Sequence, residues 1–147
     1  MSTTAETTTE AEVRTIIQER DRAIASRDVD AILNFYADDL VYFDAIPPFV
    51  ARGREILRQG WEQCFPHMPE GFRIVSEDLR VFAGPGMAAA HWLWRFVDLP
   101  VDHPAAQTLL RATAIFERRG NAWVIVHEHG SVPFDPYTNQ AVFAREA

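Results

Sequence analysis

Two charged side chains of this sequence stand among apolar residues, where an unpaired charge is costly. Asp44 ends the segment Leu40–Asp44, whose alternation is typical of a strand and places Leu40, Tyr42 and Asp44 on one face. We therefore interpret Asp44 in two ways. It is either a turn residue at the edge of a strand, in contact with water, or a carboxylate placed to accept a proton inside an apolar pocket.

Arg20 is the second such residue, because it falls in the middle of an apolar stripe at helical spacing. A buried arginine needs a partner or must extend its head to water. The candidates are Asp44 and Glu128. Glu128 points inward if the strand over residues 122–132 alternates regularly, whereas a bulge would turn it outward.

Aromatic side chains could enclose a ligand near these charges. Trp61, Trp92 and Trp94 are either walls of a pocket for a flat or aromatic molecule or ordinary core residues. Tyr42 could hydrogen-bond to Asp44 or to the ligand. We expect a small-molecule ligand and no cofactor.

His127, His129 and Ser131 alternate along one strand, which places both imidazoles on one side of it. That spacing can bind a metal ion, but no third ligand lies nearby in the sequence. We favour hydrogen-bonded residues on the outer sheet face, with Arg111 and Thr113 as cross-strand neighbours, and predict no metal site.

The elements that must position these residues change from helical to strand periodicity along the chain. Thr9 fits an N-cap, so we expect residues 1–8 to be disordered and residues 9–147 to form one domain. Helices come first and long strands with tight turns follow, which indicates an α+β fold with antiparallel pairing. The predicted ranges are helices 9–26, 29–36 and 54–65 and strands 40–44, 72–83, 87–99, 107–118 and 122–132.

Alternation sorts the last three strands into two faces. The more apolar face should meet the helices, and its Ala and Gly residues beside two Trp leave room for a cavity. The opposite face should carry Leu93, Trp123, Ile125, His127 and His129. Such a mixed outer surface suits a subunit contact, and we expect a homodimer through it.

Composition and charge limit the kinds of partner that we expect for this protein. The net charge is −7 and all 14 cationic residues are Arg, without a basic run, which argues against nucleic acid as a partner. No apolar run is long enough for a bilayer, and Ser2–Glu10 lacks the features of a signal peptide, so we expect no membrane association and a cytoplasmic location. The single cysteine rules out an intrachain disulfide. Neither a nucleophile elbow nor a phosphate-binding glycine loop occurs.

Two segments resemble known families. Residues 28–44, DVDAILNFYADDLVYFD, are similar to the second helix and first strand of ketosteroid isomerase. Residues 118–131, RRGNAWVIVHEHGS, resemble the last hairpin of SnoaL-like proteins and the association domain of calcium/calmodulin-dependent protein kinase. The resemblance, over about residues 12–134, implies the nuclear-transport-factor-2-like fold. This is a cone-shaped α+β roll with three N-terminal helices on a strongly curved, mainly antiparallel sheet.

The resemblance also implies roles. The general base of ketosteroid isomerase matches Asp44, but its two oxyanion donors fall on Arg20 and near Ala112, so true steroid isomerisation is not expected. The first hypothesis is a cofactor-independent isomerase, cyclase or dehydratase in which Asp44 takes a proton and Arg20 holds the oxyanion. Tyr42, Trp61, Trp92, Trp94 and Glu128 would then line the pocket. The alternative is a non-catalytic ligand-binding or oligomerisation module, in which Arg20 binds a small carboxylate.

Overall fold

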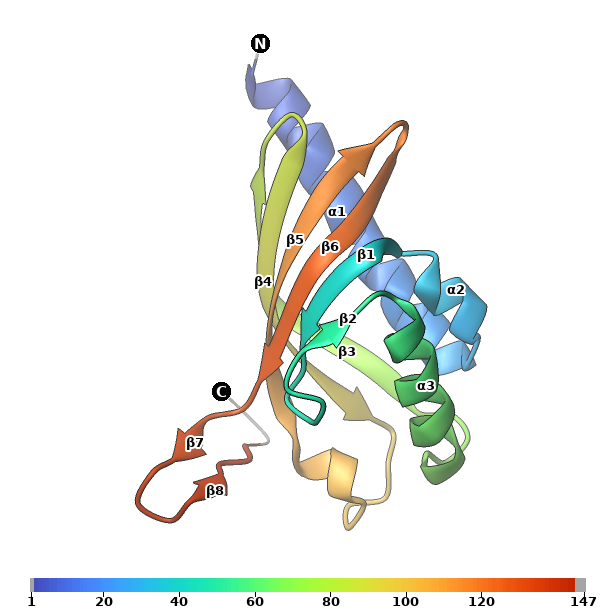
Figure 1. The fold of residues 1–147 in the computed structure, drawn as a ribbon, viewed down its shortest axis with the longest axis vertical. Helices are drawn as coiled ribbons and strands as arrows, with labels where there is room; N and C mark the ends of the chain where they lie inside the picture. Colours follow the sequence, from blue (N-terminus) through green and yellow to red (C-terminus); the bar gives the residue numbers. More distant parts are fainter. Residues whose placement is uncertain (1, 145–147) are drawn as a thin grey trace.

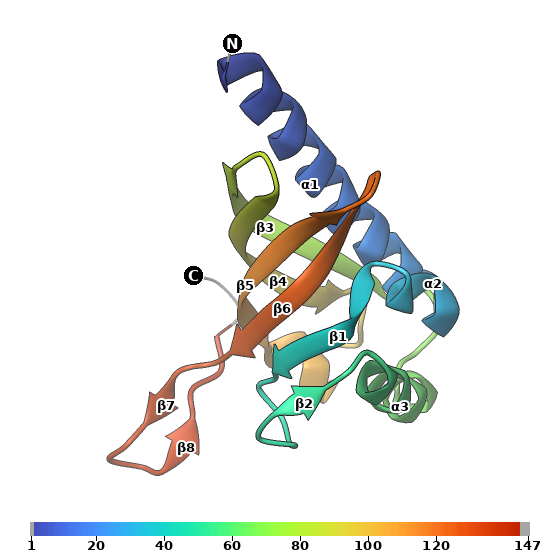
Figure 2. The ribbon, with the colours of Figure 1, turned by 45° about the horizontal axis from the view of Figure 1, so that its top comes forward.

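The computed structural model describes residues 2–144, and it is an α+β fold in which the helices lie against a strongly twisted sheet (Figures 1 and 2). The long helix α1 crosses the sheet diagonally. The shorter helices α2 and α3 lie near the lower end of α1 in Figure 1. The helices are α1 (Ser2–Ser26), α2 (Val29–Leu33) and α3 (Glu55–Cys64), with 3-10 turns η1 (Phe65–His67) and η2 (Pro104–Gln107).

Six strands form the main sheet in the order β2-β1-β6-β5-β4-β3. Only the β1–β6 pair is parallel among the pairs described, and the others are antiparallel. A separate hairpin, β7–β8, projects from the end of β6 (Figure 1). The strands are β1 (Tyr36–Phe43), β2 (Ala51–Arg52), β3 (Arg73–Ala83), β4 (Met87–Val97), β5 (Leu109–Arg119), β6 (Ala122–Ser131), β7 (Phe134–Asp135) and β8 (Gln140–Ala141).

Two predicted boundaries were wrong at the N-terminal end. Helix α1 begins at Ser2, so the segment expected to be disordered is helical, and Thr9 is a buried residue within the helix instead of its cap. Strand β1 begins at Tyr36 instead of Leu40, because Tyr36 already pairs with Ile125 of β6. The cap predicted for α2 is confirmed, since the Asp28 carboxylate accepts a hydrogen bond from the Ala31 amide at 3.0 Å.

The face toward the helices carries the core that the alternation predicted for β4 and β5. Ala90, Trp92, Ala112, Ala114 and Phe116 are all buried. They meet the apolar stripe of α1, where Val13 and Ile17 have no exposed surface. This packing fixes α1 across the sheet.

A bulge in β6 overturns part of the predicted outer face. Phe116 pairs with Ile125, but the preceding residue, Ile115, pairs with His127, which leaves Val126 without a partner in β5. The alternation therefore shifts within β6. Trp123 and Ile125 face the helices and are buried, whereas His127 and His129 lie on the outer face as predicted.

Because Ile125 and Ile115 face opposite sides of the sheet, the same change to Asp should have very different effects on stability at the two positions. Ile125 has no exposed surface, so Ile125→Asp places an unpaired charge in the core and should cost more than about 4 kcal/mol, with loss of cooperative unfolding. Ile115→Asp, on the half-buried outer side of β5, should stay folded with a much smaller loss. Thermal unfolding followed by circular dichroism measures both, and equal losses would contradict the assignment of faces.

Candidate functional site

A charged cluster lies in the interior, between α1 and the central strands. The buried Arg20 on α1 binds Glu128 on β6, with 2.7 Å between Nη1 and Oε1. Its other terminal nitrogen binds Asp21 at 3.2 Å. Of the two orientations that the sequence left open for Glu128, the structure has the inward one, with Arg20 as its partner, because the bulge precedes Glu128 and leaves its side chain directed into the core.

Hydroxyl groups extend this cluster. Tyr36 lies 3.2 Å from Arg20 Nη1 and donates a hydrogen bond to Glu128 Oε1 at 3.1 Å. Ser76 of β3 donates to the other oxygen of Asp21 at 2.6 Å. The cluster therefore joins α1 to β1, β3 and β6, and nearly every polar group in it has a partner.

Tyr42 connects the cluster to the end of β1. Its side chain is buried and hydrogen-bonds to Glu128. Desolvation, and then the charge of Glu128, raise the pKa of Tyr42 well above its ordinary value, and desolvation raises the pKa of Tyr36 as well. Both phenols are therefore neutral hydrogen-bond donors at physiological pH.

The predicted aromatic residues divide between core and partly open positions. Trp92 is buried with its ring centre 5.3 Å from Arg20 Cζ, a cation–π contact. Trp61 and Trp94 are half-buried at the two ends of a run of aromatic contacts that passes through Phe65, Phe72 and Phe96.

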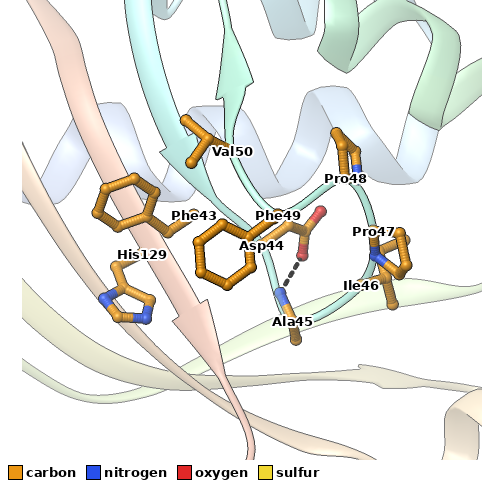
Figure 3. A pocket seen from close by; sticks show the side chains of 9 residues that line it. All are labelled: Phe43, Asp44, Ala45, Ile46, Pro47, Pro48, Phe49, Val50 and His129. Carbon is orange, nitrogen blue, oxygen red and sulfur yellow. Dashed lines mark hydrogen bonds between the residues drawn. The ribbon is translucent and has the colours of Figure 1, made fainter.

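Asp44 lies just beyond the end of β1, at the surface (Figure 3). It borders an open hollow of about 680 Å³, together with the loop of residues 45–50 and with Phe43 and His129. Oδ1 of Asp44 accepts a hydrogen bond from the Ala45 amide at 2.7 Å. Asp44 is thus an edge residue with access to water and not a member of the buried cluster.

The surroundings of Asp44 nevertheless favour its neutral form. Desolvation by partial burial raises the pKa of Asp44, the amides of Ala45 and Ile46 oppose this, and the charge of Glu128 adds to the rise. Arg20 is not among the groups that act on it. A direct Arg20–Asp44 pair is absent from the contacts of the described residues.

His127 and His129 lie on the outer sheet face, where both contact residues of β1. His127 Nδ1 lies 2.7 Å from the carbonyl oxygen of Val41, and both imidazole rings contact the Phe43 ring edge-on. The predicted cross-strand pairs are confirmed, with Arg111 opposite Ser131 and Thr113 opposite His129. No group of three side chains suited to a metal ion occurs in the part of the chain that the structure describes.

Sequence reasoning missed several residues of these two regions. Asp21 and Tyr36 in the cluster could have been suspected, since one follows Arg20 directly and the other lies in the segment that resembles ketosteroid isomerase. Ser76 gave no signal. In the hollow, Ile46 and Phe49 flank Pro47-Pro48, and apolar residues in an exposed loop are themselves a sign of a binding surface.

The sequence and the fold match known proteins. A family model described as the SnoaL-like domain matches residues 13–135, so the chain belongs to the SnoaL-like family within the NTF2-like superfamily. An NTF2-like protein of unknown function from Pseudomonas putida KT2440 is similar, with 35% identity, a TM-score of 0.85 and coverage of 96% of this chain and 98% of that one.

More distant structures share the fold alone. An NTF2-like protein with a cystatin-like fold from Novosphingobium aromaticivorans has 16% identity and a TM-score of 0.73, with 88% and 84% of the two chains covered. A candidate dehydratase of the NTF2-like family from Streptomyces avermitilis has 16% identity and a TM-score of 0.71, with 87% and 98% of the two chains covered.

A search of curated proteins gave no match. Within the described residues, no helix combines the length and apolarity needed to cross a membrane.

The buried cluster predicts a large cost for removing one charge. Glu128→Gln leaves Arg20 with one carboxylate fewer in the core and should lower the free energy of unfolding by about 3 kcal/mol or more. Glu117→Gln is the matched control, because Glu117 pairs with Arg119 at the surface and should cost less than about 1 kcal/mol. Urea unfolding of both variants measures the difference, and similar costs would contradict a structural role for the Arg20–Glu128 pair.

Proposed function

We propose that this protein is a small enzyme of the isomerase, cyclase or dehydratase kind, acting without a cofactor on an apolar or aromatic carbonyl compound. The observation that carries the proposal is the position of Asp44. Its carboxylate stands at the edge of an apolar hollow, has a raised pKa and has no cationic partner among the described contacts. Such a carboxylate is suited to general-base catalysis near neutral pH.

In the proposed step, Asp44 removes a proton from the carbon next to the carbonyl group. The C–H bond breaks, its electron pair passes to the carbonyl oxygen to form an enolate, and the proton is returned at another carbon or a leaving group departs. Arg20 is the proposed stabiliser of the enolate oxygen, while Tyr42 and Glu128 connect the two regions. The proposed walls of the substrate pocket are Trp61, Trp92 and Trp94. The name of the Streptomyces relative, a candidate dehydratase, supports this class of reaction.

The turnover rate of the variant Asp44→Asn tests whether Asp44 acts as the general base. Asp44→Asn keeps the side-chain oxygen that accepts from Ala45 but cannot take a proton, so turnover of enolisable ketones should fall at least about 100-fold. Asp102→Asn, which changes an exposed aspartate elsewhere, is the control and should match the wild type. Equal rates for wild type and Asp44→Asn in a ketone screen would remove Asp44 from the mechanism.

The raised pKa of Asp44 also predicts a pH-dependent effect on stability. A carboxyl group whose pKa is higher in the folded than in the unfolded state favours folding when protonated and loses that advantage as the pH rises through the folded value. Asp44→Asn should therefore raise the melting temperature relative to wild type at pH 7 more than at pH 3. Scanning calorimetry at both values checks this. A larger gain at pH 3 would show that the pKa is lowered instead.

The alternative is a non-catalytic binding or assembly module, and exposed apolar side chains favour it. Phe43, Ile46 and Phe49 are 37%, 65% and 96% exposed around the hollow, and Phe134 and Tyr137 of the projecting hairpin are 60% and 97% exposed. A homodimer through the outer face would cover such a surface. Sedimentation of the wild type and of Ile115→Asp tests the assembly role. A dimeric wild type with a monomeric variant supports that role, and a monomeric wild type removes it.

A further inference from the structure

Two side chains that can transfer protons line the open hollow at the end of β1. Nine residues border the hollow, and among them only Asp44 and His129 carry groups that gain or lose a proton, while the others are apolar (Figure 3). Apolar walls with a few polar groups are typical of a ligand site. The proposed function uses Asp44 of this pair and gives His129 no role.

The sheet register brings the two groups to one place. Phe43 of β1 pairs with His129 of β6, and Asp44 follows Phe43 directly. The Phe43 ring contacts the imidazole of His129 edge-on, with 5.6 Å between the ring centres. An aromatic wall therefore holds the imidazole at the border of the hollow, and the carboxylate belongs to the next residue along β1.

His129 differs from its neighbour His127 in how its ring nitrogens are used. His127 is half-buried, and its Nδ1 lies 2.7 Å from the carbonyl oxygen of Val41. His129 is exposed, and neither of its ring nitrogens has a hydrogen-bond partner among the residues that the structure describes. Its imidazole is therefore accessible both to solvent and to a molecule in the hollow, as a group that exchanges protons with a substrate must be.

The strands on either side of β6 bring one acidic group to His129. On the outer face, β5 places the uncharged Thr113 opposite His129, with Arg111 two residues away. On β1, Asp44 follows the apolar partner of His129, and His127 is the neighbouring titratable group on β6 itself. A carboxylate and an imidazole can carry opposite charges near neutral pH, which suits one to accept a proton and the other to donate one.

We propose that His129 is the general acid that works with Asp44 in the hollow, and that the reaction is the loss of water from a β-hydroxy carbonyl compound. This inference rests on the proposed function, of which it selects the dehydratase kind. The reason is the leaving group. A single carboxylate can move a proton between two carbons, but hydroxide is a poor leaving group and departs readily only when its oxygen is protonated.

The proposed step balances with these two side chains. The Asp44 carboxylate takes a proton from the carbon next to the carbonyl group, and the electrons of that C–H bond form the new C=C bond. The bond between the β-carbon and the hydroxyl oxygen breaks, and this oxygen takes a proton from the imidazolium of His129 and leaves as water. Asp44 is then protonated and His129 is neutral. Because the hollow is open to solvent, water can return both groups to their starting states.

A pair of substrates with different leaving groups tests the proposal. The aldol product of benzaldehyde and acetone is a β-hydroxy ketone that loses water, whereas its acetate ester loses acetate, which needs no proton to depart. Both give the same enone, whose ultraviolet absorbance measures each rate. His129→Gln should slow the loss of water at least about 100-fold and change the loss of acetate less than about threefold. Asp44→Asn should slow both reactions, because both break the same C–H bond.

Controls separate an acid from a structural residue. His91→Gln changes another exposed histidine of the outer face, outside the hollow, and should match the wild type with both substrates. Imidazole added to His129→Ala should restore the loss of water, a result that a purely structural role would not give. If the His129 variants do not fold, the wild type decides. Its rate of water loss should fall at high pH as the acid loses its proton, and its rate of acetate loss should not.

Three results would overturn the proposal. These are equal slowing of both substrates by His129→Gln, unchanged loss of water in His129→Gln, and no loss of water from the hydroxy ketone with the wild type. The proposed function has a separate readout, because exchange of the α-hydrogens of a ketone for deuterium in heavy water needs only the base. Exchange that depends on Asp44, without loss of water that depends on His129, leaves the proposed function standing and defeats this inference. Loss of water that depends on His129 but not on Asp44 defeats the proposed function and leaves His129 as the acid.

Discussion

The need to neutralise one buried arginine organises this structure. Arg20 lies on the core-facing side of α1, and a guanidinium there cannot lose its charge. Its partners come from three places: Asp21 on the same helix, Tyr36 at the start of β1 and Glu128 on β6. The position of α1 on the sheet is therefore set by polar contacts as well as by apolar packing. Removing one member would leave a buried charge unpaired, which is strongly destabilising.

The bulge in β6 allows that arrangement. Without the bulge at Val126, regular alternation of these residues would place Ile125 and Glu128 on opposite faces. With it, Ile125 fills the core near Phe116 while Glu128 still turns inward to Arg20. The break in alternation at the bulge thus lets a single strand contribute to both the apolar core and the charged cluster.

The same geometry separates two kinds of environment. The cluster around Arg20 is buried and almost fully hydrogen-bonded, whereas Asp44 stands at a partly desolvated edge that reaches water. Tyr42 and Glu128 lie between them, and the charge of Glu128 acts on the pKa of Asp44. A carboxylate that can exchange protons with solvent and a set of fixed interior donors are thereby held on one short strand and its neighbour.

The sequence by itself determined the α+β class, the family resemblance, the cap at Asp28 and the inward faces of β4 and β5, because these follow from local periodicity and side-chain type. It also indicated that Arg20 needed a partner, since the cost of a buried charge does not depend on the fold. Tertiary structure decided which partner it has. It also decided that Trp123 and Ile125 are core residues and that Asp44 is at the edge. Ser76 joins the cluster only through a contact 55 residues distant in the chain. Bulges, strand ends and long-range pairs depend on how elements pack, and no local pattern encodes them.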